Sequence, residues 1–304
     1  MAVATTDTYE AFGLTVQSEI DLPELSPADL GGPTDPDVTV TERAVTRPPA
    51  LTSEKSFHAA GQRDYYLKYD AATVRVRGGT RIAIDPASGA PHEVLRHVIV
   101  GPALNHLLHQ RGYFVLHAST VAIDGAAVAF VGESGQGKTT TALACLTDGH
   151  RVLSDDVAAI TLGDDGPVVR SGYPAVKLST EAVETFDPPV DPPVRTYDGR
   201  PRHFHRLRHD QPESPVPLAG VYLLEDGPEI AVESLSGSER VMSLVDNTYA
   251  IGTLGFGRQA ATNVGVCGEI AGSTSVKRLR RPRELGRLPE VIDRVRADLA
   301  GERC

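Results

Sequence analysis

The chain has 304 residues, of which 40% are hydrophobic and 23% charged, and its formal net charge at pH 7 is −10. This composition is typical of a soluble globular protein with one large or two smaller domains, and the negative charge excludes broad nucleic-acid binding, which needs a basic surface. No apolar run approaches the roughly 18 residues of a membrane-spanning helix, the first residues lack the pattern of a secretory signal, and the three cysteines lack the spacing of a disulfide scaffold or a zinc site. We therefore expect a cytoplasmic protein that binds neither nucleic acid nor membranes.

Residues 1–90 have the pattern of a β-rich domain. Pro and Gly clusters that are typical of turns separate short alternating or β-branched segments, at 12–20, 37–45, 64–69, 72–78 and 80–85. No group of side chains in this part has the composition of a catalytic site. We expect an N-terminal β-rich domain, 1–90, that shapes or recognises the phosphate acceptor, followed by a catalytic domain, 91–304.

Residues 92–110 change to a helical pattern, and Pro102 is expected to end or kink this helix. Two strands are predicted next, at 113–123 and 126–131. Asp124-Gly125 between them is a hairpin-turn signal. The second strand leads directly into the most informative segment of the chain.

The segment Gly132-Glu133-Ser134-Gly135-Gln136-Gly137-Lys138-Thr139 matches the pattern GxxxxGK[ST] of phosphate-binding loops. A buried strand precedes it, and a predicted helix, 138–147, follows it. In such a loop the glycines let several backbone N–H groups point at one phosphate, and the helix N-terminus adds a positive partial charge. The pattern predicts that Lys138 binds the β- and γ-phosphates of ATP and that Thr139 is a ligand of Mg²⁺. The predicted nucleotide-binding residues are Gly132, Glu133, Ser134, Gly135, Gln136, Gly137, Lys138, Thr139 and Thr140.

The predicted strand 151–154 ends at two adjacent carboxylates, Asp155 and Asp156. A strand–helix–strand unit of this length favours a right-handed parallel crossover, so this strand should end at the same sheet edge as the loop. Adjacent residues point to opposite sides, which allows the pair two roles. We expect Asp155 to hold Mg²⁺ and Asp156 to accept the proton of an incoming hydroxyl. A polar turn after an edge strand is the alternative.

The remaining chain is less informative. Residues 187–217 contain eight prolines, five arginines and three histidines, and we expect a long surface loop because proline does not fit central strands or helix interiors. Its part 195–209 either closes over phosphates or an acidic substrate, or is a solvated linker. Two short strands, 220–225 and 230–235, and a closing amphipathic helix, 285–299, are predicted after it.

The segment HASTVAIDGAAVAFVGESGQGKTTTALACLTDGHRVLSDD resembles the catalytic core of bacterial HPr kinase/phosphorylase, over Val115–Asp156. In that family a His precedes the loop and two aspartates follow a GHRL strand; His117, fifteen residues before Gly132, and Asp156, eighteen after Lys138, match these places. The resemblance implies an α/β P-loop kinase core of the HPr kinase/phosphoenolpyruvate carboxykinase type and ATP-dependent phosphorylation of a serine hydroxyl. It also implies that Asp156 is the proton acceptor and that His117 belongs to the active site.

The chain departs from that family at several places. Thr139 and Thr140 stand where the family usually has Ser and Glu, and GYPAVKLS (172–179) replaces its EIRGLG signature. Lys177 and Glu181 are the charged residues nearest to the family's substrate Arg and metal Glu. The start, YEAFGLTVQSEIDLPEL, is similar instead to free-standing kinase homologues found beside peptide-modification genes. These departures argue against HPr itself as the substrate.

Together these features predict an ATP- and Mg²⁺-dependent kinase in which Asp156, Lys138 and His117 are catalytic and Thr139 and Asp155 hold the metal. Its acceptor is a serine-type hydroxyl of a protein, a peptide or a small molecule. The alternative is a P-loop ATPase or nucleotide-binding switch with water as the acceptor. The carboxylate pair so soon after the loop favours the kinase. A homo-oligomer is compatible with the sequence.

Overall fold

The structure, a computed structural model, divides the chain into two compact units of mixed α and β structure. It describes residues 6–28, 35–51, 57–60, 63–196, 199, 201–207, 211–212, 214–249 and 258–302. The first unit comprises Met1–Tyr113 and Asp191–His203, and the second comprises Phe114–Val190 and Phe204–Cys304. The predicted boundary at residue 90 differs from this division, because the helical segment that follows it belongs to the first unit.

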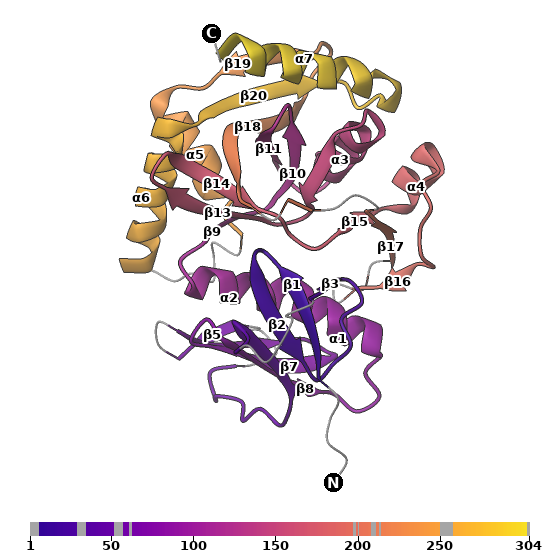
Figure 1. The fold of residues 1–304 in the computed structure, drawn as a ribbon, viewed down its shortest axis with the longest axis vertical. Coiled ribbons are helices and arrows are strands. Elements are labelled where there is room, and N and C mark those ends of the chain that lie inside the picture. The colour runs from indigo at the N-terminus through magenta and orange to yellow at the C-terminus, as the bar shows by residue number, and fades with distance from the viewer. Residues whose placement is uncertain are drawn as a thin grey trace. The chain divides into compact units, whose positions relative to one another are not determined.

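An eight-stranded sheet, drawn in indigo and purple in Figure 1, forms most of the first unit. Its strand order is β3-β1-β2-β4-β8-β7-β6-β5. Its strands are β1 (Asp7–Ala11), β2 (Leu14–Ser18), β3 (Ser26–Pro27), β4 (Val38–Glu42), β5 (Phe57–Ala59), β6 (Asp64–Lys68), β7 (Ala72–Arg77) and β8 (Arg81–Pro86). Burial alternates along β2 and β7, with every second side chain in the core. This is the pattern of a sheet with one packed face, and it explains why the strands were readable from the alternation in the sequence.

The helical segment of the first unit is kinked where the sequence predicts it. It consists of α1 (His92–Val98), a π-helical turn η1 (Ile99–Ala103) and α2 (Leu104–Gln110). Gly101 leaves helical geometry at φ −92° and ψ −106°. The next residue is Pro102, which has no N–H to donate to the preceding turn. The helix therefore bends at this point and continues as α2.

A nine-stranded sheet forms the centre of the second unit. Its main path runs β12-β10-β11-β18-β14-β13-β9, and β20 pairs with both β18 and β19. The strands are β9 (Phe114–Leu116), β10 (Ala118–Ile123), β11 (Ala126–Val131), β12 (Arg151–Ser154), β13 (Ala158–Gly163), β14 (Gly166–Arg170), β18 (Val216–Asp226), β19 (Ala231–Ser234) and β20 (Ser275–Arg281). The turn Asp124-Gly125 joins β10 and β11 as the predicted hairpin.

The strand order places the ends of β11 and β12 at one edge of the sheet. β10 lies between these two strands and is antiparallel to both, so β11 and β12 are parallel to each other. The parallel relation agrees with the crossover expected from the sequence, whereas the intervening β10 was not foreseen. The helix α3 (Lys138–Thr147) connects β11 to β12. Residues that follow the two strands are thereby brought to the same edge.

Helices cover both faces of this sheet. Val128 and Phe130 of β11 pack in a core with α3 and α7 (Leu288–Glu302), while the alternate residues Ala127 and Ala129 pack in a second core with α5 (Gly237–Asp246) and α6 (Arg258–Ser273). A strand buried on both faces has a continuous apolar sequence. This explains the run AAVAFV before the loop. Among the described residues, no helix is both long and apolar enough to cross a membrane.

The proline-rich segment 187–217 is more ordered than predicted. The expectation of one long surface loop is wrong for β17 (Pro201–Arg206), which pairs antiparallel with β16 (Val194–Arg195), and for the start of β18 at residue 216. A proline is tolerated as the first residue of a strand, which is where Pro201 stands. The ring of His205 is buried against the carbonyl oxygen of Pro189 at 2.8 Å. Residues 197, 198, 200, 208 and 209 of the predicted phosphate-closing segment lie outside the described part.

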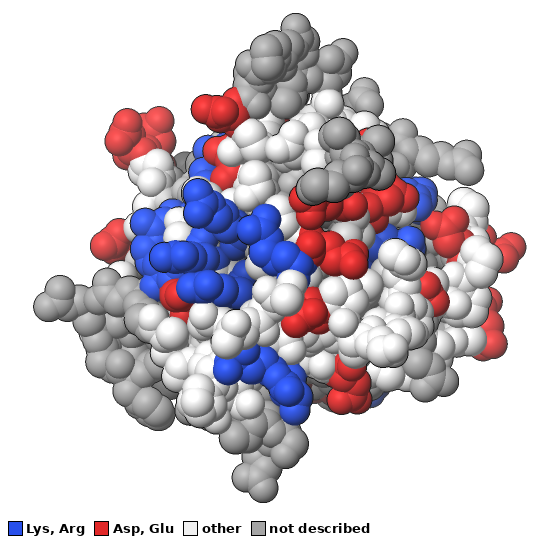
Figure 2. All heavy atoms as spheres, turned by 90° about the horizontal axis from the view of Figure 1, so that it is seen from below, with Lys and Arg blue, Asp and Glu red and all other residues white. Residues whose placement is uncertain are grey.

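Charged side chains are unevenly distributed over the surface. On the face drawn in Figure 2, Lys and Arg form one large area and smaller groups, and Asp and Glu form groups of their own. Exposed arginines of the first unit include Arg43, Arg77 and Arg81. The formal charge of −10 is therefore a sum over areas of opposite sign. That the chain does not bind nucleic acid stays a prediction.

Candidate active site

A glycine-rich loop joins β11 to α3 and ends at an unusual backbone conformation. Gly137, which directly precedes α3, has φ +78° and ψ +27°, a left-handed conformation that residues with a Cβ rarely adopt. The first intrahelical bond runs from Thr141 N to Gly137 O. The amides of the first turn, from Lys138 onward, therefore have no acceptor within the helix. Free amides at a helix N-terminus are suited to bind a phosphate group.

Lys138 lies over this loop. Its Nζ donates to the carbonyl oxygens of Gly132 at 2.7 Å and Glu133 at 3.2 Å. Only 7% of the residue is exposed, and burial lowers its pKa, although Asp156 and Asp155 act in the opposite direction. The ammonium group is thus held at the mouth of the loop, where a bound phosphate would meet it.

Asp155 follows β12 and contacts the loop helix directly. Its Oδ1 accepts hydrogen bonds from Thr139 Oγ1 at 2.8 Å and Ser119 Oγ at 2.6 Å, and its Oδ2 accepts one from the backbone N of Lys177 at 3.0 Å. Burial raises its pKa, against the effect of these hydrogen bonds. The structure therefore brings together the two residues that the sequence assigns to the metal.

The oxygen atoms of Thr139 and Asp155 suit Mg²⁺, a hard cation that proteins usually hold through one or two carboxylates plus substrate phosphates. The described residues contain no group of three or more His, Cys, Asp and Glu side chains arranged to hold a metal by themselves. A cation at this place would accordingly share its coordination with the phosphates of a nucleotide.

Asp156 has a strained backbone and two cationic or polar neighbours. Its φ of +70° lies in the left-handed region, an uncommon conformation for a residue with a Cβ and one that concentrates at functional sites. Lys177 Nζ lies 2.8 Å from Oδ2, and His117 Nδ1 lies 3.3 Å from Oδ1. Burial pushes the pKa of Asp156 up, but Lys177, His117 and Lys138 together outweigh it and hold the pKa below its ordinary value. The carboxylate is therefore ionised near neutral pH and able to accept a proton.

His117 occupies the break between β9 and β10. The sequence predicted one strand over 113–123, but β9 pairs with β13 while β10 pairs with β11 and β12, and His117 stands between them. Its backbone N donates to Asn247 O at 2.8 Å, and its Nδ1 lies 3.0 Å from the carbonyl oxygen of Asp156. Burial lowers its pKa, and Asp156 partly offsets this. Burial therefore disfavours the charged form of the imidazole, whose Nδ1 faces Asp156.

Three residues that contact the loop or the aspartates were not found from the sequence. Asn247 accepts from Gly132 N at 2.9 Å through Oδ1 and donates to Ser243 O at 2.8 Å through Nδ2, so it fastens the start of the loop to α5. Ser119 contacts Asp155, as described above. Asn247 lies far from the loop in sequence and no motif marks it, whereas Ser119 stands two residues after His117 within the segment that resembles the kinase family.

The third such residue, Arg281 at the end of β20, supports the opposite end of the loop. Its Nη2 donates to Gln136 O at 2.8 Å, and the residue is 5% exposed. A Cβ placed on Gly137 would overlap the guanidinium group. The glycine at 137 therefore satisfies two requirements, the left-handed backbone and the close approach of Arg281.

Of the two charged candidates that follow the aspartates in sequence, both among the described residues, Lys177 contacts the aspartates and Glu181 does not. Lys177, on β15 (Ala175–Leu178), contacts both aspartates, one through its backbone and one through its ammonium group. Glu181 is exposed in the first turn of α4 (Thr180–Phe186), and no hydrogen bond or ion pair joins it to the aspartates within the described ranges. Glu181 therefore remains a candidate by sequence position alone.

Comparison with known proteins gives little further information. No family model matches the chain, and no curated protein matches it. Among solved structures the chain is similar to the HPr(Ser) kinase/phosphatase from Coxiella burnetii, with a TM-score of 0.30 and 13% identity, covering 61% of this chain and 98% of that chain. This likeness is distant, so the chemistry of the site has to follow from this chain's own side chains.

Proposed function

We propose that the chain is an ATP-dependent phosphotransferase that moves the γ-phosphate to an alcohol hydroxyl of the serine type. The observation that carries this proposal is the position of Asp156. A second, ionised carboxylate lies directly after the residue paired with Thr139, and Lys177 and His117 hold it in place. Binding a nucleotide and its metal needs only the loop and Asp155. Asp156 is not needed for that binding, and its position suits a general base that accepts the proton of a hydroxyl.

Each group has a defined task in this reaction. The amides at the start of α3 and the ammonium group of Lys138 bind the phosphates and stabilise the charge of the transferred group. Thr139 and Asp155 would hold Mg²⁺, which neutralises phosphate charge when it is bound. Asp156 accepts the proton of the acceptor hydroxyl as its oxygen attacks the phosphorus atom. Lys177 and His117 fix the orientation of the Asp156 carboxylate.

The acceptor that we propose belongs to a protein, a peptide or a small molecule, and its serine-type hydroxyl is what the resemblance of residues 115–156 to HPr kinase/phosphorylase implies. Hydrolysis with water as the acceptor is the competing activity, since water can occupy the place of a hydroxyl. The two activities differ in their products. A kinase forms a phosphorylated acceptor together with ADP, whereas an ATPase forms inorganic phosphate.

The test is single-turnover transfer from γ-labelled ATP, with ATP affinity measured separately by calorimetry. Asp156→Asn keeps the shape of the side chain and removes the base, so transfer should slow by about 10²–10⁴-fold while Mg-ATP binds as tightly as before. Asp164→Asn, an exposed carboxylate in the β13–β14 turn, is the matched control and should leave both quantities unchanged. Transfer at the wild-type rate in Asp156→Asn, or a loss explained by weaker ATP binding, would refute the assignment.

A further inference from the structure

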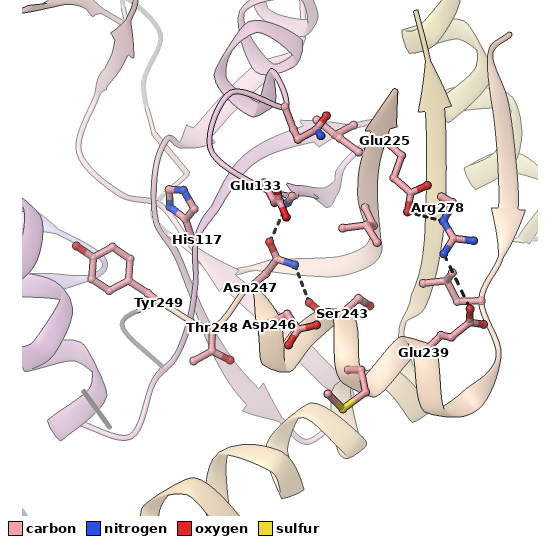
Figure 3. A pocket seen from close by; sticks show the side chains of 16 residues that line it. His117, Glu133, Glu225, Glu239, Ser243, Asp246, Asn247, Thr248, Tyr249 and Arg278 are labelled. Carbon is pink, nitrogen blue, oxygen red and sulfur yellow. Dashed lines mark hydrogen bonds and ion pairs between the residues drawn. The ribbon is translucent and has the colours of Figure 1, made fainter. Parts of the chain in front are cut away.

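A cavity of about 870 Å³ lies beside the loop in the second unit. Figure 3 shows the side chains that line it. His117 and the loop residues Glu133 and Gln136 border one part, and the end of β18, Arg278 of β20 and the helix α5 border the rest. Its volume is within the usual range for sites that bind small molecules.

The charged groups that line this cavity are mostly negative. Four carboxylates, Glu133, Glu225, Glu239 and Asp246, face one guanidinium, Arg278, which gives a formal charge of 1 − 4 = −3 with His117 neutral. Arg278 is already engaged, with its Nε 2.7 Å from Glu225 and its Nη2 3.9 Å from Glu239.

Two of the carboxylates, Glu133 and Asp246, are exposed and form no ion pair within the described part of the chain. An excess of negative charge disfavours the polyphosphate of a nucleotide in the cavity and attracts a cation.

The cavity also has an apolar wall. Leu223 and Leu224 of β18, together with Leu235 and Met242, line it, and Met242 is 52% exposed. Aliphatic side chains beside carboxylates match a ligand that has a short hydrocarbon chain and a positively charged end. A strongly hydrated sugar or an acidic metabolite would match neither part.

The position of the cavity relates it to the transfer step. His117 lines the cavity, and its Nδ1 is 3.3 Å from Asp156 Oδ1. In phosphoryl transfer the acceptor and the leaving nucleotide lie on opposite sides of the phosphorus atom, roughly in line. The side next to the general base belongs to the acceptor, so a cavity that reaches His117 is placed for the acceptor rather than for the nucleoside.

We propose that this cavity binds the acceptor, and that the acceptor is a small amino alcohol whose ammonium group lies among the carboxylates while its hydroxyl reaches Asp156. The proposal rests on the proposed function. The hydroxyl oxygen forms a bond to the γ-phosphorus, the bond from that phosphorus to the β-bridging oxygen breaks, and its electron pair leaves with ADP. The hydroxyl proton passes to Asp156 and then to solvent, so the products are the phosphate ester of the amino alcohol, ADP and one proton.

The experiment compares acceptors that differ only in charge. Phosphoryl transfer to 5-aminopentan-1-ol is measured beside hexan-1-ol, in which a methyl group replaces the ammonium, and beside 6-hydroxyhexanoate, in which a carboxylate replaces it. A series from 2-aminoethanol to 6-aminohexan-1-ol gives the preferred chain length. We expect kcat/KM to be highest for an amino alcohol, lower for the neutral alcohol and lowest for the acid.

Variants of the second unit connect this preference to the cavity. Asp246→Asn should lower kcat/KM for the amino alcohol about threefold to tenfold, between the effects of an exposed ion pair and a charged hydrogen bond, and leave the KM for ATP unchanged. Asp246→Lys should reverse the order of the amino alcohol and the acid. Asp293→Asn, on the exposed side of α7, is the matched control and should keep the wild-type preference.

Calorimetry of the same alcohols with a non-hydrolysable Mg-ATP analogue separates the two proposals. If the amino alcohol binds selectively, loses this binding in Asp246→Lys and is never phosphorylated, its binding in the cavity is upheld and the proposed kinase activity is refuted. Equal binding of the charged and neutral alcohols would overturn the cavity proposal. A rise in the KM for ATP in Asp246→Asn would also overturn it, because the cavity would then hold the nucleoside. Preference for a basic peptide over every amino alcohol would likewise refute a small-molecule acceptor.

Discussion

Replacing Gly137 by alanine tests how the loop is held against β20. The left-handed conformation at φ +78° costs alanine about 1 kcal/mol. The new Cβ would also overlap the guanidinium of Arg281, whose Nη2 donates to Gln136 O. The substitution therefore has two separable consequences, a backbone strain and a displaced arginine.

The magnitude follows from the burial of Arg281. Because this residue is only 5% exposed, its guanidinium has no solvent to move into, and displacing it breaks a charged hydrogen bond worth about 1.5–3 kcal/mol. Gly137→Ala should thus lower the free energy of unfolding of the second unit by about 2.5–4 kcal/mol. Gly149→Ala is the matched control, because φ there is +90° but nothing lies within 4 Å of an added Cβ. It should cost only the strain, about 1 kcal/mol.

The assay is urea unfolding followed by circular dichroism, together with hydrogen exchange of the α3 amides, which reports opening of that helix. Both glycine substitutions are made in the wild-type chain and in an Arg281→Ala background. In the Arg281→Ala background, Gly137→Ala should lower the free energy of unfolding only by the backbone strain. The loss caused by Gly149→Ala should be the same in both backgrounds. This account of the loop would be refuted if the two substitutions destabilised the wild-type chain equally. It would also be refuted if Gly137→Ala remained the more destabilising one in the Arg281→Ala background.

Two further predictions concern ionisable groups. Asp155→Asn should raise the Mg²⁺ concentration needed for half-maximal activity about tenfold or more; unchanged metal dependence would contradict its role. His106, whose Nδ1 lies 2.7 Å from Pro102 O, has a pKa lowered by burial, so the unfolded chain takes up the proton first and stability is lost as the pH falls below about 6.5. His106→Asn, which retains a donor to Pro102, should show a smaller loss of stability between about pH 7 and pH 5 in urea titrations, and equal losses in the two proteins would be evidence against this.

Local patterns predicted the parts of the site that are contiguous in sequence. The apolar run before Gly132, the glycine-rich loop and the carboxylates after residue 154 each have a short-range signature, because each is fixed by a strand end or a helix start. The kink at Pro102 was predictable for the same reason, since the missing N–H acts within one turn of helix.

The remaining parts of the site depend on contacts between distant segments. Asn247 and Arg281 reach the loop because β18, β20 and α5 pack beside β11, and nothing in their own neighbourhood in the sequence indicates that packing. The break at His117 was missed because both flanking segments are apolar and β-branched, so the sequence does not show that they pair with different strands. The strand β17 was missed because a segment with eight prolines is not expected to contain a strand, although a proline at the first position of a strand is tolerated.

Lys177 contacts the two aspartates through two different groups. Its backbone N–H donates to Asp155, and every amino acid except proline supplies that donor, whereas its ammonium group contacts Asp156, beside the imidazole of His117. A change of residue type at position 177 to anything but proline would therefore keep the hydrogen bond to Asp155 and alter only the contact to Asp156. A single substitution at this position would thus change the basicity of Asp156, while the hydrogen bonds that Asp155 accepts from Ser119, Thr139 and the backbone of residue 177 remain.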